Sequence, residues 1–187
     1  MELWAHGKTI DLLKVAYNYE ERGQIVQLYT ASIDNRYGEG KITTRIGLSR
    51  ACSTFSKDTN IFIDIVRKNF KPDCVLIDEA QFLTKAQVKE LTDVVDFLNI
   101  PVICYGLKTD FRQEFFEGSE MLMKMADKIE EIKTICDCGG KATINMRFID
   151  GKPVIEGKQI VIGGNDSYKS VCRKCFRKYI GKVNINC

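Results

Sequence analysis

Two short apolar runs with an amphipathic helix between them constrain the fold of this chain most strongly. The runs are DCVLIDEA (73–80) and IPVICYG (100–106), and continuous apolar runs of this length are typical of strands buried on both faces of a sheet. Between them, Thr84 and Gln87 form a capping-box pattern. Five apolar residues then recur on one helical face: Val88, Leu91, Val94, Val95 and Leu98. A strand, a helix and a second strand in this order predict a parallel sheet with crossover helices, an α/β fold.

The amino-terminal half continues the same alternation. Residues 9–19 have helical spacing, and Gly23 follows them as a stop signal. Residues 24–30 are rich in β-favouring side chains, and 61–70 have the pattern of a helix. Residues 31–47 carry three glycines and several charges, so we expect a loop there. In a parallel sheet, functional side chains collect at the carboxyl ends of the strands.

The pattern changes after about residue 132. Residues 141–164 contain β-favouring runs on both sides of Asp150-Gly151, which is a strong hairpin-turn signal. A length of 187 residues suits one full domain with a small appendage. We therefore predict a nucleotide-binding domain over 1–132 and a small β-rich domain over 133–187.

Four of the eight cysteines lie in two close pairs that bracket this hairpin, Cys136 with Cys138 and Cys172 with Cys175. Four thiolates can hold one tetrahedral zinc ion, and a small domain with little core benefits from such a cross-link. Reduced free thiols and a reducible disulfide are the alternatives. A catalytic zinc is not expected, because four cysteines leave no open position for a substrate.

Composition and charge exclude several classes of protein. The net charge of +3 is too small, and the lysines too dispersed, to indicate a nucleic-acid partner on charge alone. No window approaches eighteen apolar residues, and the amino terminus lacks the layout of a secretory signal. We therefore expect a cytoplasmic protein that binds neither membrane nor nucleic acid.

Two short motifs carry the chemistry. Gly7-Lys8-Thr9 runs into a helix, where the glycine lets backbone N–H groups approach phosphate, the lysine neutralises it and the threonine hydroxyl can bind Mg²⁺. Asp78-Glu79 ends a buried strand, where the first carboxylate suits Mg²⁺ and the second can act as a base. Each motif alone is weak: the tripeptide is common by chance, and the carboxylates could be a solvated strand end. Together they favour an ATP-using phosphotransferase.

Seven segments in order along the chain resemble thymidine kinase of the cellular, zinc-containing type, close to its bacterial members. The resemblance implies a P-loop (RecA-like) core with a small zinc-binding domain. The tight Cys-x-Cys pair is also similar to that bacterial subgroup. The segments are GKT (7–9), YNYEERG (17–23), IDNRYGEGKITTRIGLS (33–49), VLIDEAQFLT (75–84), IPVICYGLKTDFRQEFF (100–116), KTICDCGGKA (133–142) and VIGGNDSYKSVCRKC (161–175).

The resemblance implies transfer of the ATP γ-phosphate to the 5′-hydroxyl of thymidine in pyrimidine deoxynucleotide salvage, with deoxyuridine also accepted. It implies that Gly7, Lys8 and Thr9 hold the phosphates and Mg²⁺, that Asp78 serves the Mg²⁺, and that Glu79 is the base. It further implies a structural Zn²⁺, a homotetramer and feedback inhibition by thymidine triphosphate.

For the nucleoside, the resemblance implies a loop that wraps the base and a set of pocket-lining side chains. The expected residues are Val161, Ile162, Gly163, Gly164 and Tyr168 in the loop, and Phe82, Leu107, Phe111 and Phe116 in the pocket. For each aromatic residue, ordinary core packing is the alternative. Asp34 and Arg36 match a segment near the phosphates, with a solvated loop as the alternative. His6, the only histidine, is assigned no role.

The amino terminus is the one departure from the family pattern. Only six residues precede Gly7, and Glu2 stands where the phosphate-loop pattern has its first glycine. We therefore expect the first strand and the start of the loop to be missing. A truncated or misassigned start is the first explanation; partial substitution by Met1–His6 and a paralogue that binds nucleotide without turnover are the others. A zinc-ribbon module that binds nucleic acid or protein is a further alternative.

Overall fold

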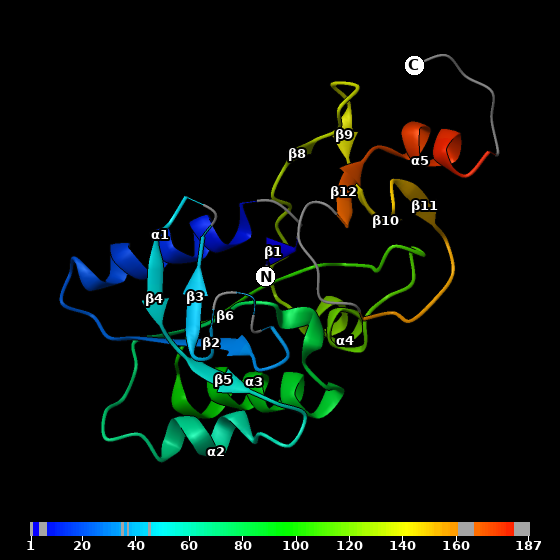
Figure 1. Cartoon of the computed structure of the whole chain (residues 1–187). Helices are drawn as coiled ribbons and strands as arrows, with labels where there is room; N and C mark the ends of the chain where they lie inside the picture. The colour runs from blue at the N-terminus through cyan, green and yellow to red at the C-terminus, as the bar shows by residue number, and fades with distance from the viewer. Residues whose placement is uncertain are drawn as a thin grey trace.

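A parallel sheet forms the centre of the computed structural model (Figure 1), which describes residues 2–3 (backbone only), 7–34, 36, 38–44, 46–160 and 167–181. Every neighbouring pair of its strands is parallel, which confirms the predicted α/β class. In spatial order the strands are β1 (Glu2–Leu3), β7 (Val102–Gly106), β6 (Cys74–Ile77), β2 (Val26–Ala31) and β5 (Ser53–Phe55).

Helices cover both faces of this sheet. One core contains Leu28 and Leu76 from the strands and packs them against α1 (Lys8–Glu20). The other contains Tyr29 and Val75 and packs against α2 (Ile61–Val66), α3 (Lys85–Leu98) and α4 (Glu117–Met125). Neighbouring residues of a strand point to opposite faces, so fully buried strands need apolar residues at every position. Within the described part of the chain, none of the helices is long and apolar enough to cross a membrane.

The region after β6 departs from a simple strand-to-helix connection. A short 3-10 turn, η1 (Ala80–Phe82), leads into the predicted capping box, in which Thr84 and Gln87 each accept from the other's backbone N–H. Helix α4, which the sequence analysis does not predict, packs closely on this turn. A Cβ at Gly118 would lie 2.6 Å from the Leu83 carbonyl oxygen, so only glycine permits this approach.

Two expectations for the segment between β2 and β6 are wrong. Residues 31–47 do not form only a loop, because β3 (Lys41–Thr43) pairs antiparallel with β4 (Ser49–Ala51). The turn between them needs Gly47 at φ 88° and lacks the two-residue Asn-Gly signal of a short hairpin. Helix α2 ends at Val66, with Arg67 as its C-cap residue, and so stops before the predicted residue 70.

The amino terminus supplies a strand after all. Glu2 pairs with Tyr105 and Leu3 with Gly106, which makes β1 a parallel neighbour of β7. The expectation that no strand precedes the phosphate-binding motif is therefore wrong for these two residues. An edge strand needs hydrogen bonds on one side only, so two extended residues suffice to pair with β7. Residues 1 and 4–6, including His6, lie outside the described residues.

The cysteine-bearing segment has its own sheets and its own core. The Asp150-Gly151 turn joins two antiparallel strands as predicted, with φ of 49° and 72°, the left-handed values of a type I′ turn. The division at 132–133 stays a prediction. In Figure 1 these elements lie at the top, away from α2 and α3. They are β8 (Thr134–Ile135), β9 (Lys141–Ala142), β10 (Ile144–Ile149), β11 (Lys152–Val154), β12 (Tyr168–Val171) and α5 (Arg173–Tyr179), which we call the cysteine module.

Candidate active site and metal centre

Two sequence motifs that are 69 residues apart meet at the carboxyl end of β6. The Thr9 hydroxyl donates to Asp78 Oδ2 at 3.3 Å, and Lys8 Nζ lies 3.6 Å from Glu79 Oε2. The sheet topology brings the two motifs together, because α1 begins at the end of the sheet where β6 also ends. The structure thus brings together the four polar side chains that the sequence analysis assigns to phosphate, Mg²⁺ and base.

The start of α1 has the properties of a phosphate cradle. Gly7, its N-cap residue, has φ 89°, a left-handed value that other residues adopt only with strain. No side-chain hydrogen bond caps the amino end of α1. A helix amino terminus attracts anions through its first N–H groups and through its dipole. Lys8 is only 5% exposed, so its ammonium group faces the site rather than bulk water.

Asp78 is a buried carboxylate with a raised pKa. Burial first and then the charge of the neighbouring Glu79 raise the pKa of Asp78 to about 6, and the charge of Lys8 opposes this rise. Its backbone N–H donates to the Tyr29 carbonyl, and its Oδ1 accepts from the Glu79 backbone N–H. The other oxygen, together with the Thr9 hydroxyl, presents the oxygen ligands that Mg²⁺ prefers. These two oxygen atoms fit a magnesium ion that is also bound by phosphate oxygens.

Glu79 has an unusual backbone and three side-chain partners. Its φ of 52° is in the left-handed region, which is uncommon for a residue with a side chain and frequent at functional sites. Besides Lys8, its carboxylate faces Arg36 Nη2 at 3.4 Å and accepts from Gln81 Nε2 at 2.5 Å. Gln81 is a residue of the site that the sequence analysis does not identify, although it stands two residues after Glu79.

Arg36 reaches the same carboxylate from the segment after β2. It also forms a two-pronged contact with Asp34, with nitrogen–oxygen distances of 2.7 and 2.5 Å. Burial alone would raise the pKa of Asp34, but the hydrogen bonds and charge of Arg36, helped by Lys8, leave that pKa lowered. Asp34 therefore stays ionised and holds the guanidinium beside Glu79. The structure places both residues near the motif, as the resemblance implies.

Three of the predicted pocket residues, Phe82, Leu107 and Phe116, are connected by contacts that begin next to Glu79. The rings of Phe82 and Phe116 meet edge to face with centroids 6.0 Å apart, and the Leu107 backbone N–H donates to Gln81. Phe111 is 2% exposed, and its ring has Arg147 of the cysteine module 5.4 Å away. Such burial fits the alternative of ordinary core packing for Phe111, and its place in a pocket stays a prediction.

The wrapping loop is described only at its end. Val161, Ile162, Gly163 and Gly164 lie outside the described residues. Tyr168 is in β12, opposite Arg147, and burial raises the pKa of its phenol, with the charge of Asp110 adding to the rise and Arg147 opposing it. The segment between β11 and β12 contacts the region of the main sheet, because Gln159 Nε2 donates to the Phe115 carbonyl at 3.1 Å.

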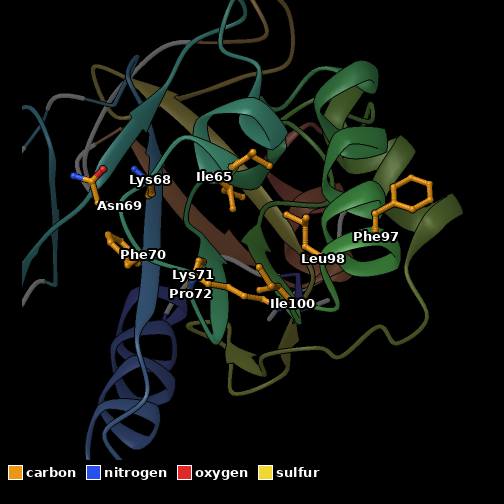
Figure 2. A pocket seen from close by; sticks show the side chains of 10 residues that line it. Ile65, Lys68, Asn69, Phe70, Lys71, Pro72, Phe97, Leu98 and Ile100 are labelled. Atoms are coloured by element: carbon orange, nitrogen blue, oxygen red, sulfur yellow. The ribbon is translucent and has the colours of Figure 1, made fainter.

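A hollow lies at the amino end of the parallel strands, away from this cluster (Figure 2). Its walls include Lys68, Pro72, Phe97 and Ile100, which come from the ends of α2 and α3 and the approaches to β6 and β7. These are the amino ends of the parallel strands, whereas Asp78 and Glu79 follow the carboxyl end of β6. The hollow therefore belongs to a different surface from the cluster of charged residues.

The four predicted cysteine ligands converge in the cysteine module. Their sulfur atoms all lie within 4.8 Å of one another, and those of Cys138 and Cys172 are 3.6 Å apart. A tetrahedral zinc–thiolate site with Zn–S bonds of about 2.3 Å requires sulfur–sulfur distances of about 3.8 Å. The pKa of the Cys172 thiol is lowered to about 7, first by the backbone N–H of Cys175, which donates to Cys172 Sγ, and then by hydrogen bonds with the other three cysteines. The geometry fits a structural zinc ion with all four positions filled.

Comparison with known proteins gives a consistent family assignment. A sequence profile described as thymidine kinase matches residues 4–176. The thymidine kinase of Mannheimia succiniciproducens is 52% identical over 181 residues, 95% of this chain and 93% of the relative. That of Haemophilus influenzae strain 86-028NP is 53% identical over 180 residues, with the same two shares. That of Listeria monocytogenes strain EGD-e is 57% identical over 171 residues, 90% of each chain.

Proposed function

Because the chain belongs to the thymidine kinase family, we propose that it transfers the γ-phosphate of ATP to the 5′-hydroxyl of thymidine, with Glu79 as the base. The alternative of a paralogue that binds without turnover has no support from relatives that carry the name of the enzyme. A nucleic-acid-binding zinc ribbon is likewise unsupported, because the family profile spans both the main sheet and the cysteines.

One observation carries the assignment of roles: Lys8 faces Glu79, and Thr9 faces Asp78, at a single edge of the sheet. Phosphoryl transfer requires a cation at the phosphates, oxygen ligands for Mg²⁺ and a base near the attacking hydroxyl. The four side chains supply these three functions within one cluster.

In the proposed reaction, Lys8 and the first N–H groups of α1 bind the β- and γ-phosphates. Thr9 and Asp78 would hold Mg²⁺, which would neutralise part of the phosphate charge. Glu79 accepts the proton of the 5′-hydroxyl as the oxygen attacks the γ-phosphorus, and ADP leaves. Arg36, which is within reach of Glu79, is placed to stabilise charge on the transferring group.

The nucleoside would lie beyond Glu79, against the edge-to-face pair of Phe82 and Phe116. We propose that Leu107 and Phe111 complete the wall and that residues 161–164 with Tyr168 enclose the pyrimidine. Deoxyuridine lacks only the thymine methyl group, and one methyl changes binding modestly, so it is expected as a weaker substrate.

The remaining parts of the proposal concern assembly and setting. A structural Zn²⁺ would join Cys136, Cys138, Cys172 and Cys175. By family resemblance we propose a homotetramer in the cytoplasm that supplies precursors for DNA synthesis and is inhibited by thymidine triphosphate.

The test is Mg²⁺-dependent formation of thymidine monophosphate from ATP and thymidine. Glu79→Gln removes the base and is expected to lower kcat by roughly 100-fold or more. Glu21→Gln is the matched control, because Glu21 is exposed at the end of α1 and far from the cluster in sequence and contact. Unchanged kcat in Glu79→Gln would remove Glu79 as the base, and no product from zinc-loaded wild type would contradict the proposed activity.

A further inference from the structure

We propose that Gln81 is the positioning residue of the reaction: it holds the Glu79 carboxylate in the orientation that accepts the proton and ties it to the wall of the nucleoside pocket. This inference rests on the proposed role of Glu79. Gln81 itself neither gives nor takes a proton, and it acts only through the residue that it contacts.

The contacts of Gln81 use both ends of its amide. Nε2 donates to Glu79 Oε2 at 2.5 Å, and Oε1 accepts from the Leu107 backbone N–H at 3.0 Å. A backbone N–H can only donate, so the oxygen of the amide must face Leu107 and the NH₂ group must face Glu79. The side chain therefore has one satisfactory orientation, which aims a donor at the carboxylate.

The backbone around Gln81 leaves this side chain no room to move. Gln81 is 3% exposed and lies in η1, directly against the end of β7. A Cβ at Gly106 would be 3.0 Å from both the backbone nitrogen and Oε1 of Gln81, so the glycine permits the close contact. We call the two hydrogen bonds that join Glu79, Gln81 and Leu107 the bridge. Ser119 of α4 donates to the Leu107 carbonyl at 2.5 Å and fixes the Leu107 end of the bridge.

The other partners of Glu79 differ from Gln81 in charge. Lys8 and Arg36 are cations that also face the expected position of the phosphates, and an incoming triphosphate competes with Glu79 for them. Gln81 is neutral and buried, so phosphate does not attract it away. During the reaction, Gln81 is then the described side chain that keeps the Glu79 carboxylate fixed while Lys8 and Arg36 turn to phosphate.

The bridge also connects the base to the substrate that it serves. Leu107 belongs to the proposed pocket wall, and Phe82, the residue after Gln81, belongs to it as well. A nucleoside that presses on this wall therefore acts on the same short segment that orients Glu79. Positioning of a base within a fraction of an ångström contributes strongly to rate, so loss of the bridge should lower kcat rather than weaken ATP binding.

The experiment compares two Gln81 variants with two controls in the full-length, zinc-loaded protein. Gln81→Met keeps the length of the side chain but removes both hydrogen bonds. Gln81→Glu can still accept from Leu107 but places a second carboxylate against Glu79. Gln87→Met is the structural control, because Gln87 is also buried and also bonded at both ends, to Thr84 and to the Ser56 and Thr59 carbonyls. Glu79→Gln reports on the base itself.

The expected result is a loss of kcat by roughly 10- to 100-fold in Gln81→Met, as for a lost hydrogen bond to a charged group, with the KM for ATP within about twofold. Gln87→Met should lower thermal stability without lowering kcat. In Gln81→Glu the introduced carboxyl can donate to Glu79 only when protonated, so its activity relative to wild type should rise as the pH falls from 8 to 6. A purely structural role for Gln81 would not produce this acid rescue.

Three results would overturn the inference. The first is wild-type kcat in Gln81→Met while Glu79→Gln is inactive, which leaves the proposed function intact and removes only the bridge. The second is an equal loss of kcat in Gln87→Met, or no acid rescue in Gln81→Glu, which would make Gln81 ordinary packing. The third is full activity of Glu79→Gln, which would remove the base and its positioning residue together.

Discussion

The active-site edge of the main sheet and the cysteine module hold their functional side chains in different ways. At the sheet edge, Lys8 and Asp78 are almost fully buried charged groups, supported by two hydrophobic cores on the two faces of the sheet. In the module, the buried core is small, and two of its eight buried members, Cys136 and Cys175, are themselves predicted zinc ligands.

The difference indicates which region depends on a bound ligand for its stability. Burial of Asp78 beside Glu79 costs stability, and the large surrounding cores offset that cost whether or not a nucleotide is present. The module has no such reserve, because a core of this size contributes little, and its four sulfur atoms lie close enough together for one metal ion to join them. We therefore expect metal removal to affect folding and site mutations to affect rate.

Metal removal tests this comparison with the largest expected effect. Binding of structural zinc by four cysteines carries an apparent free energy of about 10 kcal/mol or more, and in small domains this free energy is folding free energy. Chelation, or Cys175→Ser, should unfold β8–β12 and α5 while the parallel sheet keeps its structure. Hydrogen exchange would show loss of protection in β8–β12 and α5 and continued protection in β2, β6 and β7.

The control for metal removal is Cys52→Ser, a half-exposed cysteine outside the cluster. Protection that persists throughout the module after complete removal of zinc would break the comparison. The four cysteines would then be reduced free thiols or form a reducible disulfide, which are the alternatives that the sequence analysis leaves open.

Substitution of Lys8 is expected to have the next largest effect, on rate rather than on folding. Lys8→Ala removes the cation from the phosphate cradle and should lower kcat/KM for ATP by about 1,000-fold or more, since charge stabilisation dominates phosphoryl transfer. The measurement is steady-state kinetics beside thermal unfolding. The fold should persist, because α1 keeps Leu12 and Ala16 in its core.

Lys14→Ala serves as the matched control, because Lys14 is an exposed lysine two turns along the same helix. A similar loss of activity in both variants would mean that α1 as a whole, rather than the ammonium group of Lys8, supports the reaction. The comparison would then fail, because substitutions at this end of the sheet would affect folding as well as rate.

The success of the sequence analysis follows the same division. Strands β6 and β7 and helix α3 are predicted because their periodicity and the Thr84–Gln87 cap are local signals. The four cysteines and the Lys8 and Asp78 motifs are predictable because their chemistry restricts them to few roles. The strand β1 and the β3–β4 hairpin are missed, since a two-residue strand has no period and the hairpin depends on Gly47.

The role of Gln81 could not be predicted because nothing local distinguishes it. Its position next to Leu107 depends on how η1 packs against the end of β7, and on the absence of a side chain at Gly106. A single glutamine in an apolar stretch carries no signal for that tertiary contact. Arg36 also reaches Glu79 across 43 residues of sequence, and only the family resemblance, not a local signal, indicates that its segment lies near the phosphates.

The smallest expected effect concerns the pH dependence of stability and comes from Asp78. Its pKa is raised to about 6 in the folded protein, so the folded state binds more protons than the unfolded state between about pH 4 and pH 6. Stability contributed by the protonated form is present at low pH and is lost as the pH rises through about 6. Asp78→Asn abolishes this loss of stability with rising pH, because asparagine does not ionise. The substitution also removes a proposed Mg²⁺ ligand.

Asp78→Asn should therefore be more stable than wild type at pH 7, and its advantage should shrink by about 1 kcal/mol at pH 5. Urea unfolding at the two pH values measures the difference, with Asp58→Asn, an exposed aspartate, as the control. Activity should fall in Asp78→Asn at both pH values. A variant that is less stable than wild type at pH 7 would show that the contact with Thr9 outweighs the burial of charge. The functional groups would then stabilise this end of the sheet, as we expect a metal to stabilise the cysteine module.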